Sequence, residues 1–308
     1  MPSVKPAPKS PNPFDSLIEA ANDDPEQIHG FQAAYEGHRL ALNAEHRVIF
    51  SSSHFGGVSV DPILLRLVDP TVEPGFVDPR HSITFIARPP DQVLELIRTC
   101  QDMVRQVVPG LWLYPRSTLH MTALEMTHSR TADEIALLVN QLRDVAPSIV
   151  NHPVGHRTRL IKPFLCFNTI AVALTFIPAV EVSAPGHINP YTYHHMRRDL
   201  FDHARTSGAE IGSRYAVPSA HITIGRYIRT EDFETDGKVD LKKANRLVER
   251  IDEINALLER ELWPKEDGSI AAGGEWIFGE QKGLEWHTGP VWYGSGGETL
   301  LVGEGFLA

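Results

Sequence analysis

The sequence contains two copies of a His-x-Thr tripeptide, one at His120 and Thr122 and the other at His221 and Thr223. In a β-strand, side chains at positions i and i+2 point to the same face, so each copy presents one imidazole beside one hydroxyl. Cleavage of a phosphodiester needs a base to activate water, an acid to protonate the departing oxygen, and donors that hold the phosphoryl oxygens. Histidine suits both proton-transfer roles because its ordinary pKa is about 6.5. The four side chains therefore predict phosphodiester chemistry if the two strands meet across a cleft.

A single His-x-Thr is common by chance, and a lone histidine on an apolar strand is more often a hydrogen-bonded core residue than a catalyst. The two copies here are 101 residues apart (221 minus 120), and each has an apolar residue between its histidine and its threonine. Both also lie inside strand-like segments that occupy matching places in a repeated order of elements. We therefore favour the catalytic interpretation of the pair over the packing one.

The repeated order around the motifs is strand, helix, His-x-Thr strand and helix. β-branched and aromatic runs predict the strands, and apolar residues at helical spacing with capping residues predict the helices. The first unit comprises 81–88, 91–108, 118–125 and 131–145, and the second comprises 169–178, 189–208, 220–228 and 240–263. This repetition predicts two lobes related by approximate two-fold symmetry.

The motifs, His120-Met-Thr-Ala123 and His221-Ile-Thr-Ile224, resemble the HxTx signatures of the two-histidine (2H) phosphoesterase superfamily, which includes RNA ligase-like proteins and cyclic nucleotide phosphodiesterases. The resemblance covers about residues 81–303. It implies hydrolysis of a 2′,3′-cyclic phosphate or a related nucleotide phosphoester, with one histidine as base, the other as acid, and the threonines on the phosphate oxygens. Ala123 stands where a larger aliphatic residue is usual, a change of packing that leaves the chemistry intact.

Pattern and resemblance together predict an α+β fold: two pseudo-symmetric lobes with largely antiparallel sheets flanked by helices, and an active site in the central cleft. Residues 1–13 have the composition of a disordered tail. An N-terminal extension over 14–80 is expected to mix helix and loop, with a short strand at 47–50. The phosphoesterase-like domain then spans 81–308, with lobe one at about 81–150, lobe two at about 165–265 and C-terminal strands at 275–303.

The charge balance limits the class of substrate. A formal net charge of −10 disfavours extended nucleic-acid tracking, because that mode of binding needs a large basic face. A small nucleotide or a single RNA terminus requires only a local positive site and remains the expected partner. The apolar runs are too short for a membrane span, and no signal peptide is evident, so we expect no membrane partner and a cytoplasmic or nuclear location.

The proposed chemistry needs no cofactor, and the sequence offers no convincing metal site. HExxH and CxxC are absent, and the His-x-Thr spacing lacks a third ligand. His194, His195 and His203 lie within one predicted helix, where packing is favoured over metal binding.

Arg226 and Tyr193 are the candidate substrate-binding residues outside the motifs. Arg226 fits a phosphate clamp by its charge, but it follows Thr223 by three positions and so falls on the opposite face of a regular strand. Tyr193 precedes the second motif and would stack on a base if it reached the cleft. The competing interpretations are a surface or lobe-linking arginine and a core tyrosine.

Three functions remain open at this point. The leading hypothesis is a metal-independent cyclic phosphodiesterase. The second is an RNA 3′-end exonuclease or a ligase acting on longer RNA, against which the acidic charge counts. The third is a module that binds a phosphorylated ligand without turnover, against which the two intact histidines count. The sequence leaves the oligomeric state open.

Overall fold

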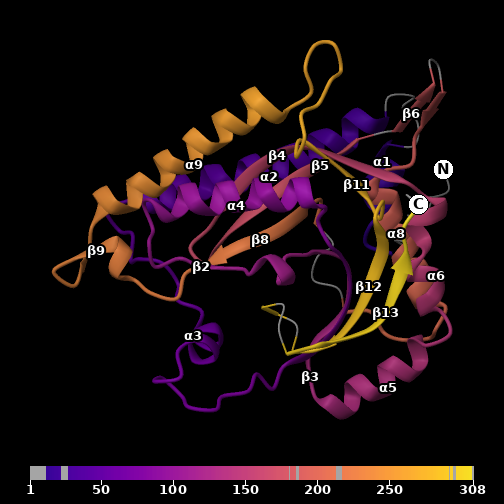
Figure 1. The fold of residues 1–308 in the computed structure, drawn as a ribbon, viewed down its shortest axis with the longest axis horizontal. Coiled ribbons are helices and arrows are strands. Elements are labelled where there is room, and N and C mark those ends of the chain that lie inside the picture. The colour runs from indigo at the N-terminus through magenta and orange to yellow at the C-terminus, as the bar shows by residue number, and fades with distance from the viewer. Residues whose placement is uncertain are drawn as a thin grey trace, which may run out of the picture.

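The computed structural model describes residues 12–21, 27–179, 181–184, 187–212, 217–290, 292–293 and 296–306 (Figure 1). The predicted tail, residues 1–13, therefore lies outside the described residues except for its last two. None of the described helices is both long and apolar enough to cross a lipid bilayer.

Two antiparallel sheets form the framework. The smaller sheet has the order β13-β12-β1-β3, with bounds Glu298–Glu304, Lys282–Gly289, His81–Ala87 and Met121–Arg130. The larger sheet has the order β11-β4-β5-β8-β2, with bounds Glu275–Phe278, Thr158–Phe167, Ala171–Ala179, Ala220–Arg226 and Trp112–Leu113. Two short hairpins add β6 (Glu181–Ala184) with β7 (His187–Asn189), and β9 (Glu234–Thr235) with β10 (Lys238–Val239). The predicted α+β class with antiparallel sheets flanked by helices is confirmed.

Helices cover these sheets in the predicted repeated order, β1–α4–β3–α5 followed by β5–α8–β8–α9. The α-helices are α1 Asp15–Ala21, α2 Gln27–Ser51, α3 Pro62–Val68, α4 Asp91–Arg105, α5 Ala132–Leu142, α6 Ala146–Val150, α7 His152–Gly155, α8 Tyr193–Arg205 and α9 Leu241–Leu262. Two 3-10 turns, η1 (Arg116–Thr118) and η2 (Glu231–Phe233), complete the described elements.

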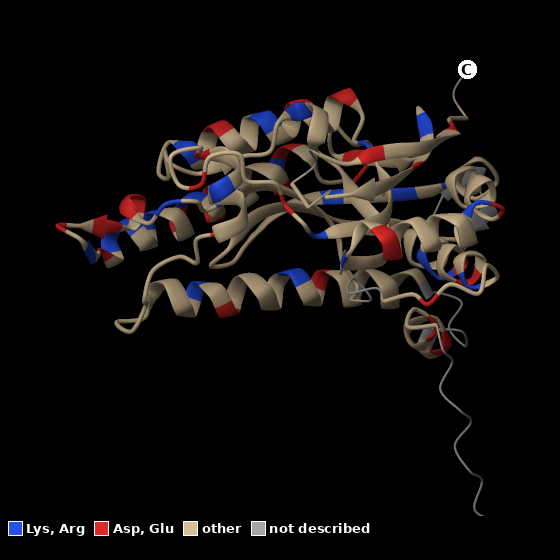
Figure 2. Ribbon diagram, turned by 90° about the horizontal axis from the view of Figure 1, so that it is seen from below, with Lys and Arg blue, Asp and Glu red and all other residues tan. Residues whose placement is uncertain are grey.

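The two sheets are built from non-consecutive parts of the chain. Helix α4 follows β1 of the smaller sheet but packs against helix α9 and against strand β8 of the larger sheet. Helix α8 follows β5 of the larger sheet and packs against β3 of the smaller sheet as well as β4 and β5 of the larger one. Each repeat unit thus places its first helix on the other unit's His-x-Thr strand. Helix α2 packs on β4, β5 and α9, and Figure 2 shows it as a separate layer beside the strands.

Three local predictions need correction. The strand predicted at 118–125 begins at Met121, because Arg116–Thr118 forms the 3-10 turn η1. The segment 47–50, predicted as a short strand, is the end of α2, where Phe50 continues the buried face of that helix and Val48 is exposed. Phe50 in this segment is fully buried and stacks on Phe55. The helix expected from residue 189 begins at Tyr193, because Thr192 is its N-cap and forms a capping box with His195.

Candidate active site

The structure brings the four motif side chains together. Strands β3 and β8 come from different sheets and contact each other. His120, which directly precedes β3, then Thr122 on β3, and His221 and Thr223 on β8, all line one small cavity of about 60 Å³. We call this the phosphate cavity, after the group that the two motifs predict for it. Its size suits a compact polar group and not a whole nucleotide.

His120 is fixed by a backbone contact. Its Nδ1 lies 2.8 Å from the carbonyl oxygen of Thr118, so Nδ1 carries the proton that donates to this acceptor. In the neutral ring, Nε2 then carries the lone pair. Burial lowers the pKa of His120 to about 4, although the Thr118 contact acts in the opposite direction. His120 is therefore a neutral imidazole at pH 7.

His221 has a more adaptable partner. Its Nδ1 lies 2.9 Å from the hydroxyl of Ser219, which can either donate or accept a hydrogen bond. Burial, then Arg197, then His120 lower the pKa of His221 to about 4. The contribution from His120 means that the two rings cannot easily be protonated together.

A network of charged side chains holds the backbone that precedes His120. Arg88 donates to the carbonyl of Leu119 (3.2 Å), which precedes His120, and to the carboxylate of Glu285 (2.9 Å). Burial acts to raise the pKa of Glu285, but hydrogen bonds from His287 and Lys282 and the charge of Arg88 hold it far below its ordinary value. The carboxylate therefore stays ionised and keeps Arg88 in place.

Arg226 points into the site, contrary to the strand face expected from its spacing. Strand β8 has a β-bulge: Ala173 on β5 pairs with Thr223, but Val172 pairs with Gly225, so Ile224 is an extra residue. The extra residue shifts the alternation by one, which returns Arg226 to the face of His221 and Thr223. Arg226 accordingly lines the phosphate cavity.

Two partners hold the Arg226 side chain. Its Nε donates to the hydroxyl of Tyr114 (3.2 Å), and its Nη1 lies 3.5 Å from Asp61. The hydroxyl of Tyr293 donates to the same Asp61 carboxylate at 2.7 Å. Asp61 belongs to the predicted N-terminal extension, so this segment contributes directly to the position of a cavity residue.

Tyr193 does not reach the cavity, so the suggested stacking role is corrected to a core role. Its side chain is fully buried and packs edge-on against Phe278. Its hydroxyl donates to the carbonyl of Thr122 at 3.4 Å. Tyr193 therefore supports the first motif from the core side, as the first residue of α8 after the Thr192 cap.

The phosphate cavity also contains residues that the sequence did not single out. These residues are Ser82, Thr84, Tyr114, Glu125 and Trp292. They come from β1, β3 and two loops, and no short motif marks them.

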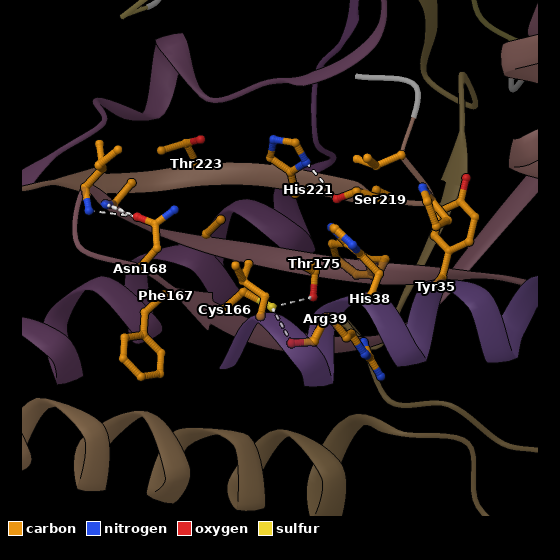
Figure 3. A pocket seen from close by; sticks show the side chains of 18 of the residues that line it. Tyr35, His38, Arg39, Cys166, Phe167, Asn168, Thr175, Ser219, His221 and Thr223 are labelled. Atoms are coloured by element: carbon orange, nitrogen blue, oxygen red, sulfur yellow. Dashed lines mark hydrogen bonds between the residues drawn. The ribbon is translucent and has the colours of Figure 1, made fainter. Parts of the chain in front are cut away.

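A larger cavity of about 410 Å³ adjoins the first and shares His221, Thr223 and Arg226 with it. Figure 3 shows His221 and Thr223 on one side of this cavity and Tyr35, His38 and Arg39 of α2 on the other. We call it the side cavity. Its volume lies toward the low end of the range of about 300–1,000 Å³ typical of small-molecule sites.

The histidines of α8 serve packing contacts. His194 donates from Nε2 to the carbonyl of Phe14 (3.0 Å) and accepts at Nδ1 from the Tyr35 hydroxyl (3.1 Å). His195 caps its own helix, and His203 packs edge-on against His152. Among the residues described by the structure, no group of three or more His, Cys, Asp or Glu side chains is placed to hold a metal ion.

Charged residues are mixed over the helices seen in Figure 2. Along α2, for example, acidic and basic residues alternate, and no continuous basic face is visible in this view of the described chain. The positive groups near the site are local ones, above all Arg226.

The sequence matches no protein-family model and no curated protein. Among solved structures, the chain is similar to Usb1 of Kluyveromyces marxianus, with 10% sequence identity over 72% of this chain and 98% of that one, and a TM-score of 0.34.

Proposed function

We propose that this protein is a metal-independent phosphodiesterase that hydrolyses a 2′,3′-cyclic phosphate, or a related phosphoester of a nucleotide or RNA end, by two-histidine catalysis. The observation that supports the proposal most strongly is that His120, Thr122, His221 and Thr223 line one cavity. A base, an acid and hydroxyl donors are the groups that this reaction requires.

In the proposed reaction, Nε2 of His120 accepts a proton from water as the water oxygen attacks phosphorus. The bond from phosphorus to the 2′ or 3′ oxygen breaks, and the protonated His221 delivers its proton to that oxygen. The assignment of His120 as the base follows from its tautomer, since the Thr118 carbonyl holds the proton on Nδ1. Proton transfer by positioned groups of this kind contributes about 10²–10⁴-fold to a rate.

Three further groups stabilise the charge on the phosphoryl oxygens. The hydroxyls of Thr122 and Thr223 are donors at the wall of the cavity, and Arg226 brings a permanent positive charge. Preorganised donors of this type cost no reorganisation at the moment of reaction. The Ser219 hydroxyl can accept from Nδ1 of protonated His221, so it supports the acid form of that ring.

The proposal is tested by hydrolysis of the four nucleoside 2′,3′-cyclic phosphates in excess EDTA. His120→Ala and His221→Ala should each lower the rate by about 100-fold or more. The matched control is His128→Ala, which removes a half-buried histidine of β3 that does not line the cavity. Full activity in either motif variant contradicts the two-histidine mechanism, and tight binding without turnover in the wild type favours a binding module.

A further inference from the structure

The side cavity adjoins the phosphate cavity and shares three lining residues with it, His221, Thr223 and Arg226. A ligand whose phosphate lies between the two histidines can therefore place its remaining part in the side cavity while it stays in contact with the shared residues. The small phosphate cavity has no room for more than a compact group, whereas the side cavity has about 410 Å³.

Helix α2 builds the outer wall of the side cavity. Tyr35, His38, Arg39 and Leu42 follow the i, i+3, i+4, i+7 spacing of one helix face and all line it. This helix lies before residue 81 and so outside the part of the chain that carries the His-x-Thr repeat. The residues of this wall therefore come from the N-terminal segment of the chain.

The wall is held in place by hydrogen bonds to the larger sheet. Asn43 donates to the carbonyl of Leu165 (2.8 Å) and accepts from the amide of Phe167 (3.2 Å). Arg39 donates to the carbonyl of Lys162 at 2.7 Å. The cavity is therefore preformed, which lowers the entropic cost of binding a ligand there.

Small side chains give the cavity its depth. On β5, Ala171 pairs with Arg226 and Ala173 pairs with Thr223, and both alanines line the cavity between α2 and β8. Because partners across a strand pair point to the same face, a larger residue at either alanine would occupy the space beside the catalytic strand.

The chemistry of the lining favours an uncharged group with flat faces and polar edges. None of the described lining residues is Asp or Glu, although the chain as a whole carries a net charge of −10. Leu42, Ile170 and Val217 supply apolar surface, and His38 supplies a polar ring edge. Nη1 and Nη2 of Arg39 donate to the Lys162 carbonyl and the Glu36 carboxylate, so Glu36 offsets the charge of this guanidinium within the wall.

We infer that the side cavity binds the nucleoside attached to the scissile phosphate, with α2 as its wall, so that the substrate is recognised as a single nucleotide unit. The inference rests on the proposed function, since it takes the phosphate cavity as the place of the scissile phosphate. A base packed between α2 and β5 would contact the His38 ring and the apolar surface, while Arg226 stays on the phosphate.

The test is a comparison of two ligands by titration calorimetry, namely each nucleoside 3′-monophosphate and inorganic phosphate. The wild type should bind at least one nucleotide about tenfold or more tightly than inorganic phosphate. His38→Ala, and Leu42→Trp, which narrows the cavity from the α2 side, should each weaken nucleotide binding by about tenfold and leave phosphate binding unchanged.

The matched control is His46→Ala, on the same helix but not among the residues lining the cavity, and it should change neither affinity. Equal affinity for nucleotide and phosphate in the wild type overturns the inference, as does equal weakening of both ligands by His38→Ala. Turnover of cyclic nucleotides is measured on the same preparations. Nucleotide-selective binding that depends on His38 without any turnover overturns the proposed function and leaves the nucleoside site supported.

Discussion

Gln101 on α4 donates a hydrogen bond of 2.9 Å to the carbonyl of Ile224, the residue that follows Thr223 in the second motif. The other repeat unit has a counterpart, since Arg197 on α8 donates to the carbonyl of Ala123, which follows Thr122 in the first motif (3.3 Å). Each His-x-Thr strand is therefore fixed by a buried polar side chain from the other unit's helix. The two motifs are coupled through the core as well as through their shared cavity.

Replacement of Gln101 by methionine should destabilise the protein. Gln101 is buried and also donates to the carbonyl of Tyr114 (3.2 Å), so Gln101→Met removes the donor to two buried carbonyls at nearly constant volume. The free energy of unfolding, measured with urea, should fall by about 1–3 kcal/mol. The matched control Gln92→Met, at an exposed position of the same helix, should change it by less than about 0.5 kcal/mol. An equal effect of the two substitutions would contradict the role of the buried amide.

The sequence predicted the elements with strong periodicity and the motifs that they carry. The strands around His120 and His221 and the repeated order of elements were predicted because residue alternation and helix capping are local signals. The predicted α+β class with antiparallel sheets is confirmed by the structure. The error at Phe50 has a tertiary cause: β-branched and aromatic residues favour strands locally, but burial of this side chain against Phe55 and Phe167 stabilises the helix.

The lining of the two cavities depended on information that the sequence alone does not contain. The position of Arg226 depends on a β-bulge, which is a mismatch of register between β8 and its neighbour β5. The contribution of α2 depends on long-range contacts such as the one between Asn43 and Leu165. Neither feature has a short motif, so the sequence could give only the charge of Arg226 and the helical spacing of α2.

The rate of hydrolysis should change mainly at pH values below the ordinary pKa of histidine, which is about 6.5. Burial lowers the pKa values of His120 and His221 to about 4, so at pH 7 both rings are neutral and the acid form of the pair is scarce. Between pH 7 and 5, kcat/KM for a cyclic nucleotide should therefore rise as the pH falls, because one ring becomes protonated. In the enzyme–substrate complex, the phosphate anion stabilises the imidazolium and raises the pKa of the histidine. The increase of kcat with falling pH should therefore occur at a higher pH than the increase of kcat/KM.

The measurement for this prediction is the initial rate over pH 4–8 at several substrate concentrations, with circular dichroism to confirm that the fold persists at each pH. A kcat/KM that increases from pH 5 to 7 would show that no protonated histidine is required in the free protein.

Removal of the Arg226 charge should impair catalysis more than folding. Arg226→Gln keeps a donor for the Tyr114 hydroxyl but loses the positive charge at the phosphate cavity. The expected loss in kcat/KM is about 100-fold, the size typical of a preorganised donor on a developing negative charge. The matched control Arg229→Gln alters an exposed arginine just beyond β8 and should leave the rate unchanged. A similar loss in both variants would point to a general effect of surface charge.

The stability of the fold should fall in mild acid because several histidines are buried in the neutral form. His194 is the clearest example: its Nε2 donates to the Phe14 carbonyl, its Nδ1 accepts from Tyr35, and burial lowers its pKa to about 4. Between pH 6.5 and 4 the unfolded chain binds a proton at this residue and the folded chain does not, so the free energy of unfolding decreases as the pH falls. Each such histidine contributes up to about 1.4 kcal/mol per pH unit within this window.

Urea unfolding at pH 7, 6 and 5 measures this slope directly. Glutamine at this position cannot be protonated, so His194→Gln should reduce the slope of the free energy of unfolding against pH by the contribution of roughly one proton. The substitution also weakens the contacts to Phe14 and Tyr35, so it should lower the stability at pH 7. His54→Gln, at an exposed position, is the control that should leave the slope as it is. A slope that is unchanged by His194→Gln would mean that this ring takes up its proton in the folded protein as readily as in the unfolded chain.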